Sequence, residues 1–104
     1  MFNVRNGVIY HTRGDTASLA VNLKDADGNA ITGYTAMMTV KKRLKDDDFL
    51  FQVPVKNGMV NISHETTQSL PYGDYVYDIE VHMADGEVQT IGPYEYHLTP
   101  DVTT

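Results

Sequence analysis

The segment HETTQ, His64 to Gln68, comes closest to a catalytic motif in this sequence. In the HExxH helix of zinc hydrolases, two histidines one helical turn apart bind the metal, and the glutamate activates a water molecule. Gln68 stands where the second histidine would be, and Leu70-Pro71 would end a supporting helix too soon. The segment therefore does not predict a zinc site.

Residues 24–29, KDADGN, have the residue types of a calcium-binding loop. An EF-hand loop requires glycine at its sixth position and a bidentate glutamate at its twelfth. Counted from Asp25, glycine is the fourth residue and Ala36 the twelfth, so neither requirement is met. Asp27-Gly28 is instead typical of a tight turn. Weak calcium binding by Asp25 and Asp27 stays open, but we predict no metal site and no cofactor.

Arg13-Gly14-Asp15 is the tripeptide by which some adhesion proteins bind integrins. An integrin ligand presents this tripeptide at the tip of a long exposed loop. Here it directly precedes a segment of alternating apolar residues, so we expect Gly14 to provide the backbone freedom of a turn and Asp15 or Thr16 to cap it. The tripeptide is predicted to be the turn that opens a strand.

The remaining residues that could carry chemistry are scattered. The chain has no cysteine, and GxSxG, P-loop and GxGxxG motifs are missing from it. The predicted strand pairing places His82 opposite Gln89 and His97 opposite Asp74, and the second contact is more simply a cross-strand pair than part of a catalytic triad. We therefore predict no catalytic residue and no enzymatic activity. The histidines are His11, His64, His82 and His97.

Charge and hydropathy restrict the partners. Eight basic and fourteen acidic residues give a formal charge of −6, which disfavours a nucleic-acid partner. The one basic cluster, KKRLK at 41–45, runs directly into DDD at 46–48, which is typical of a solvated loop. No apolar run approaches the ~18–20 residues of a membrane span, and the first residues lack the apolar stretch of a secretory signal. We expect synthesis in a cytoplasm and no membrane partner.

The elements that position these residues are predicted to be strands. Apolar and polar residues alternate over most of the chain with the period of two that half-buried strands show. Only Ser63 to Gly73 breaks the pattern, with room for one short helical turn before Pro71. Two of the alternating apolar sets are Leu19, Val21 and Leu23, and Tyr34, Ala36, Met38 and Val40.

Two hairpins can be recognised from their turns. Asn57-Gly58 is typical of a type I′ turn, which would pair Val55 with Val60 and Val53 with Ile62. A second two-residue turn is predicted at Asp85-Gly86, with Gly92-Pro93 bending the last strand or breaking its register. The pairs expected from this turn are Met83 with Val88, Val81 with Thr90, Tyr77 with Tyr94, and Tyr75 with Tyr96.

About seven short strands with turn signals every 8–12 residues predict an all-β fold, an immunoglobulin-like antiparallel β-sandwich with one short helical turn. We expect a single domain over residues 1–104, with a core at about 8–98 and a polar tail at 99–104. The chain has seven tyrosines, which we expect mainly at core or rim positions of the sandwich. Exposed tyrosines would instead suit a binding face.

A set of ordered segments resembles a known family. RGDTASLAVNL, DADGNAITGYTAMMTVKK, NGMVNISHETTQSLPYGDYVYDIEV and DGEVQTI are similar to the N-terminal immunoglobulin-like domain of siphophage baseplate upper proteins and to related small virion proteins. The similarity lies mainly in Gly14-Asp15-Thr16, Asp27-Gly28, Thr32-Gly33 and Gly73-Asp74-Tyr75.

The resemblance implies a non-enzymatic structural or accessory protein of a phage or prophage virion. Such a protein would be made in the bacterial host cytoplasm and would dock onto capsid, neck, tail or baseplate. Its partners would be other virion proteins and further copies of itself. The alternative is a stand-alone immunoglobulin-like module that binds carbohydrate or protein.

The segment FLFQVPV, residues 49–55, is the predicted contact region. Alternation places Phe49 and Phe51 on the core face with Leu50 and Gln52 on the outer face. Pro54 cannot donate to a strand ladder, so we expect a strand at an edge or one that carries a bulge. The predicted interface residues are Met37, Leu50, Gln52, Pro54 and Met59.

Overall fold

Eight strands and one short helix make up the part of the chain that the structure, a computed structural model, describes, residues 2–100. The last four residues of the predicted tail, 101–104, lie outside this range, and Thr99 still belongs to the last strand. The elements are β1 (Phe2–Arg5), β2 (Val8–Thr12), β3 (Ala17–Ala20), β4 (Thr35–Lys41), β5 (Phe51–Lys56), β6 (Met59–Ile62), α1 (His64–Gln68), β7 (Gly73–His82) and β8 (Val88–Thr99).

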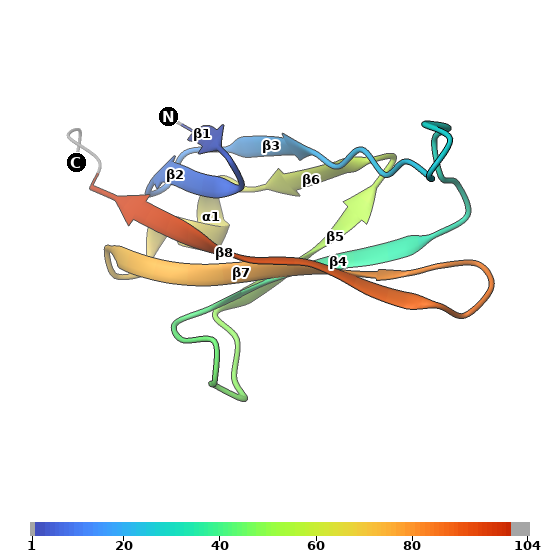
Figure 1. Cartoon of the computed structure of the whole chain (residues 1–104). Coiled ribbons are helices and arrows are strands. Elements are labelled where there is room, and N and C mark those ends of the chain that lie inside the picture. The colour runs from blue at the N-terminus through green and yellow to red at the C-terminus, as the bar shows by residue number, and fades with distance from the viewer. Residues whose placement is uncertain (1, 101–104) are drawn as a thin grey trace.

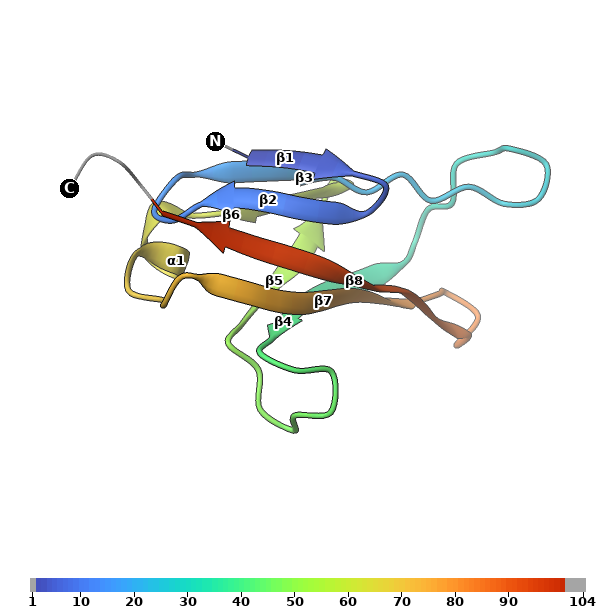
Figure 2. The same cartoon turned by 60° about the vertical axis from the view of Figure 1, so that its left-hand side comes forward.

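All eight strands belong to one sheet with the order β1-β2-β8-β7-β4-β5-β6-β3. Neighbouring strands are antiparallel except β2 and β8, which run parallel. The sheet rolls up until its two end strands, β1 and β3, lie beside each other in both views, so it is nearly closed into a barrel (Figures 1 and 2). The predicted all-β class is confirmed.

Strand β5 passes from one side of the roll to the other. Residues 51–54 pair with β4, whereas Val55 and Lys56 pair with β6. The turn at Asn57-Gly58 has the positive φ angles of a type I′ turn, 53° and 73°, and Val55 pairs with Val60 as predicted. Val53 pairs with Met38 of β4 and not with Ile62, because β5 has left β6 by that point. β5 is thus an inner strand, although residues 51–54 pair on one side only.

The N-terminal hairpin β1–β2 was not anticipated as a pair of strands. Asn6-Gly7 closes it with φ angles of 50° and 85°, the same turn chemistry as at Asn57-Gly58. A Cβ added at Gly7 would lie 2.6 Å from the Tyr94 ring, so the turn and β8 pack closely. Phe2 and Val4 pack against the core, which therefore begins before residue 8.

The tip of the β7–β8 hairpin differs from the predicted register by one residue. The Met83 N–H donates to the Glu87 carbonyl at 2.8 Å, so residues 84–86 form a three-residue loop instead of a two-residue turn. Val88 consequently pairs with His82 and not with Met83. A shift of one residue moves a side chain to the other face of a sheet. Val88 is therefore 52% exposed, whereas the predicted pair with Met83 would have placed both side chains on one face.

A bulge further along the hairpin restores the predicted register. Ile79 pairs with Ile91, and Tyr77 pairs with Tyr94, so β8 contributes one more residue than β7 between these pairs. The extra residue falls at Gly92-Pro93, where a break in register was predicted. Tyr75 then pairs with Tyr96 as expected.

The core lies inside the rolled sheet and is mainly aliphatic with three tyrosines. Helix α1 has five residues, and no helix within residues 2–100 is long and apolar enough to cross a membrane. His11 and Thr67 are the buried polar residues of the described chain. The buried apolar residues are Ile9, Ala17, Val21, Ala36, Met38, Val40, Phe51, Val60, Ile62, Tyr75, Tyr77, Ile79, Val81, Tyr96 and Leu98.

Candidate interaction surface

Helix α1 packs against the turn that contains Arg13-Gly14-Asp15. The backbone N–H of Gly14 donates to the buried Thr67 hydroxyl at 2.9 Å, and His64 Nδ1 donates to the Gly14 carbonyl at 2.5 Å. The HETTQ segment therefore serves as a support for this turn. Within residues 2–100, no group of three or more His, Asp or Glu side chains could hold a metal ion.

The Arg13-Gly14-Asp15 turn is part of a packed end of the molecule. It forms the short connection from β2 to β3, and Gly14 has a φ of 82°, as predicted for a turn. The Arg13 guanidinium lies 4.1 Å from the centroid of the Tyr72 ring and donates to the Leu70 carbonyl at 3.5 Å. The tripeptide is thus not at the tip of a long loop, which is the setting that an integrin ligand requires.

His11 is fully buried and bonded at both ring nitrogens. Nε2 lies 2.8 Å from the Asp15 carbonyl, which can only accept, so Nε2 carries the proton. Nδ1 is then the acceptor for the Tyr96 hydroxyl. Burial lowers the pKa of His11 below its ordinary value of 6.5, and the bond to Asp15 opposes this effect. His11 and Tyr96 are therefore a buried pair whose side-chain polar atoms are hydrogen-bonded, and the pair joins β2 to β8.

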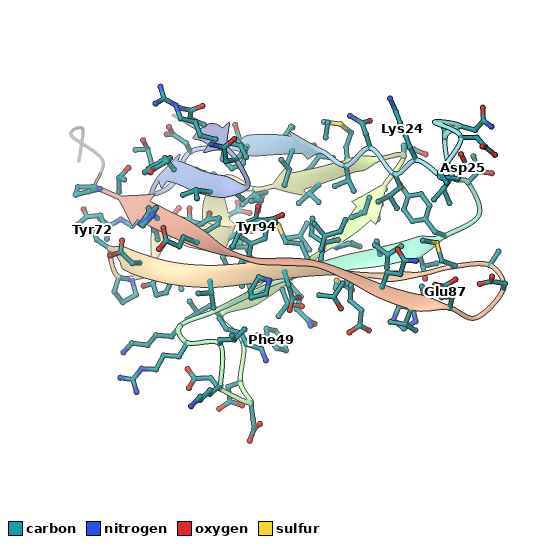
Figure 3. The ribbon with its side chains drawn as sticks, in the orientation of Figure 1. Lys24, Asp25, Phe49, Tyr72, Glu87 and Tyr94 are labelled. Carbon is teal, nitrogen blue, oxygen red and sulfur yellow. The ribbon has the colours of Figure 1, made fainter. Side chains whose placement is uncertain are left out.

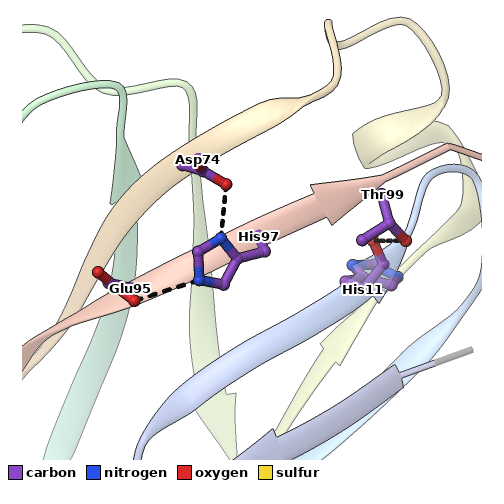
Figure 4. A network of polar contacts seen from close by, with 5 residues as sticks. All are labelled: His11, Asp74, Glu95, His97 and Thr99. Atoms are coloured by element: carbon purple, nitrogen blue, oxygen red, sulfur yellow. Dashed lines mark hydrogen bonds and ion pairs between the residues drawn. The ribbon is translucent and has the colours of Figure 1, made fainter.

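His97 lies on the surface between two carboxylates, as predicted in part (Figure 4). Nδ1 donates to Asp74 at 2.5 Å, which confirms the cross-strand pair, and Nε2 donates to Glu95 at 3.2 Å. The hydrogen bond to Asp74 is the main cause that raises the pKa of His97. Its ring also stacks on Tyr10 with 5.0 Å between centroids. In the protonated ring both nitrogens donate to these carboxylates.

The KDADGN loop forms a turn held by its own first aspartate. Asp25 Oδ1 accepts from the backbone N–H groups of Asp27 and Asn29, both at 2.9 Å. The loop borders an open hollow of ≈ 510 Å³ shared with the β7–β8 tip, where Lys24, Asp25 and Glu87 are labelled in Figure 3. The Asp25 carboxylate, which was a candidate ion ligand, thus accepts hydrogen bonds from the backbone of its own loop.

Three of the five predicted interface residues lie side by side on the outside of the sheet. Met37 of β4 pairs with Pro54 of β5, and Thr39 pairs with Gln52, whose amide donates to the Thr39 hydroxyl at 3.0 Å. Met37 also pairs with Glu80 of β7. We call these five residues the outer face. Met37, Gln52, Pro54 and Glu80 are exposed, so the outer face combines apolar contact area with amide and carboxylate groups.

Leu50 and Met59 are not part of the outer face. Leu50 packs against the core, and its N–H donates to the Val40 carbonyl at 2.7 Å. Phe49, expected in the core, is 51% exposed. Alternation failed here because the strand begins only at Phe51, so the two preceding residues do not follow its period. Met59 lies on β6, beyond the point where β5 crosses to the other side.

The loop from residue 42 to 50 adds two exposed apolar groups, Leu44 in the segment predicted to be a solvated loop and Phe49, which was predicted to lie on the core face. It projects from the body of the molecule in both views (Figures 1 and 2). Leu44 is 58% exposed, and Phe49, labelled in Figure 3, lies on the same loop. The Lys41 ammonium donates to the Asp46 carbonyl at 2.9 Å, which ties the base of the loop together. The signal that could have identified them is an apolar residue set against charged neighbours, Leu44 between Arg43 and Lys45 and Phe49 directly after Asp48.

The tyrosines divide between the core and the surface. Burial raises the pKa of Tyr77 to about 12, and it also raises the pKa of Tyr75. Three other tyrosines keep considerable exposure, Tyr10 at 44%, Tyr72 at 43% and Tyr94 at 39%. The buried tyrosines match the expectation of core positions, whereas the exposed ones fit either rim positions or a binding face.

No family model matches this sequence, and no curated protein matches it either.

Proposed function

We propose that the protein is a non-enzymatic structural or accessory component of a phage virion that docks onto other virion proteins through the outer face. The observation that carries the proposal is the side-by-side placement of Met37, Gln52 and Pro54 on β4 and β5, the two strands that the projecting loop connects. Apolar groups with amide and carboxylate neighbours are the composition of a protein interface. The resemblance of the sequence to virion proteins provides the biological setting.

The finer fold is proposed as an immunoglobulin-like sandwich whose two layers are joined by β5. In support, β8, β7 and β4 are consecutive neighbours in the sheet and form one group. β3 and β6 are hydrogen-bonded neighbours and form the second group. The switch of β5 from β4 to β6 links the two groups into one sheet. The parallel pairing of β2 with β8 joins the N-terminal hairpin to the edge of the first group.

A stand-alone carbohydrate-binding module is the second candidate. The observation that favours it is the exposure of Tyr10 and Tyr72, whose rings are stacked on His97 and Arg13. Neighbouring carboxylates of Asp74 and Glu95 could accept hydrogen bonds from sugar hydroxyls. Binding of oligosaccharides that is abolished by Tyr10→Ala, with Met37→Lys unaffected, would favour this module over the virion protein.

The virion proposal is tested by incorporation. Met37→Lys places a charge in the outer face without touching the core, and we expect it to lower the copy number of the protein in purified particles. Gln68→Lys, at an exposed position of α1, is the matched control and should be incorporated normally. Equal incorporation of both variants would show that the outer face is not the docking site. Absence of the wild-type protein from purified particles would reject the virion role.

A further inference from the structure

The roll of the sheet leaves an apolar seam between its two end strands. Neither β1 nor β3 has a strand neighbour on its outer side within residues 2–100. Between them lies a hollow of ≈ 280 Å³, and Tyr94, labelled in Figure 3, is one of its lining residues. We call this gap, with the free edge of β3, the seam. Its apolar lining includes Val4, Leu19, Val21, Tyr77, Ile91 and Tyr94.

The free edge of β3 carries no charge and no proline that would block strand pairing. Natural edge strands carry charges, prolines or bulges that block the approach of another strand. Residues 16–23, TASLAVNL, contain no charged residue and no proline. Ala20 ends the strand and is exposed. An edge of this kind can accept a further strand.

The same chain carries a second free edge at the β7–β8 hairpin. β8 pairs with β2 only from Tyr96 onward, so the stretch that starts at Val88 is bonded to β7 alone among the described strands. The hairpin extends away from the rolled part of the sheet in Figure 1. Val88 is half exposed near its tip and offers an apolar side chain. The residues before the Gly92-Pro93 bulge, 88–91, are therefore the part of this edge that can pair with another strand.

The β7–β8 hairpin is acidic, whereas the charged residues on the strands around the seam are basic. Residues 73–99, which contain the hairpin, hold six acidic residues and no Lys or Arg. Strands β1, β3, β5 and β6 contain no Asp or Glu, and they carry the exposed basic residues Arg5 and Lys56. Opposite charges on two parts of one chain favour contact between copies and set its orientation. The acidic residues are Asp74, Asp78, Glu80, Asp85, Glu87 and Glu95.

From these observations we propose that the seam binds the β7–β8 hairpin of a second copy of the chain. The free edge of β8 beginning at Val88 adds as a strand to β3, and Val88 covers the apolar hollow. Because the two surfaces differ, the contact is head-to-tail, and repetition gives a ring or a filament. The proposal concerns contacts between copies, so it stands independently of the outer face and of the virion role.

A charge reversal in the seam tests the proposal. We expect the wild-type protein to self-associate with concentration in sedimentation velocity, and less at high salt because the charges are screened. Ala20→Glu should weaken association by about tenfold or more through repulsion of the acidic hairpin. Ala20→Lys, of similar size and opposite charge, should leave it intact. Both variants should keep the wild-type melting temperature, because Ala20 is exposed.

A matched reversal on the hairpin completes the experiment. Glu87→Lys should also weaken self-association, since it places a cation opposite Arg5 and Lys56. A mixture of Ala20→Glu and Glu87→Lys should associate again, because each altered surface then meets an opposite charge. A strictly monomeric wild-type protein, equal behaviour of Ala20→Glu and Ala20→Lys, or no recovery in the mixture would each overturn the proposal. Loss of association in Met37→Lys but not in Ala20→Glu would move the contact to the outer face and overturn it too.

Discussion

Removal of the Tyr96 hydroxyl should destabilise the protein more than removal of a similar hydroxyl elsewhere. Tyr96→Phe leaves the Nδ1 acceptor of His11 without a donor in a fully buried position. The ring cannot move its proton to Nδ1, because Nε2 would then oppose the Asp15 carbonyl with a second acceptor. An unsatisfied buried polar group costs ~1–3 kcal/mol. No buried side-chain nitrogen or oxygen in residues 2–100 is unpaired in the wild type, so the variant would create the first.

The matched control is Tyr75→Phe. Tyr75 is also buried, but its hydroxyl donates at 2.5 Å to the carbonyl of Pro71, an exposed residue that water can reach. Its loss should cost only the ~0.5–1.5 kcal/mol of a typical hydrogen bond. At ~4–8 °C per kcal/mol for a domain of this size, Tyr96→Phe should melt roughly 10 °C below wild type, and Tyr75→Phe only a few degrees below. Calorimetry would measure both. A loss for Tyr96→Phe no larger than for Tyr75→Phe would refute the role given to His11.

Three further predictions follow from the same contacts. Asp74 raises the pKa of His97 above 6.5, so the contribution of the charged His97 to stability is present below pH 6.5 and is lost as the pH rises through the folded pKa. The melting temperatures of wild type and His97→Gln should therefore differ at pH 5 and converge at pH 9, and a difference that does not change with pH would contradict this. Gly7→Ala should lower the free energy of unfolding, measured by denaturant titration, more than Gly86→Ala does. Both glycines have a positive φ, but a Cβ at Gly7 would lie 2.6 Å from the Tyr94 ring, whereas nothing lies within 4 Å of a Cβ at Gly86. Equal losses would show that the Tyr94 ring moves aside freely. Leu50→Lys should lower the free energy of unfolding by ~2 kcal/mol or more, because Leu50 packs against the core; an unchanged free energy would return Leu50 to the surface on which alternation had placed it.

Local sequence signals determined the turns and most of the strand faces. Asn57-Gly58 specified a type I′ turn, because asparagine and glycine tolerate positive φ, and the pair Val55–Val60 followed directly. Alternation correctly placed Ala36, Met38 and Val40 in the core. These features depend on residues close together in sequence, so no knowledge of distant contacts was needed.

The placement of the candidate surface depended on where strands begin and cross. Alternation put Leu50 outside, but the strand starts one residue later, and no local signal marked that boundary. Met37 and Pro54 were predicted to share an interface and do lie as neighbours, whereas Met59 is separated from them by the crossing of β5. The crossing exists only after residues 51–54 have paired with β4 and residues 55–56 with β6, and these pairings form only in the folded sheet.

The sequence by itself determined that this chain is rich in short strands with defined turns, and that Tyr77 meets Tyr94. Only the tertiary structure decided that one sheet rolls until β1 and β3 become neighbouring free edges, and that His11 is buried against Tyr96. The physical reason is the separation along the sequence over which each interaction acts. Turn preferences and side-chain alternation act over a few residues, whereas His11 and Tyr96 are 85 residues apart in sequence, and their contact exists only after β2 has paired with β8.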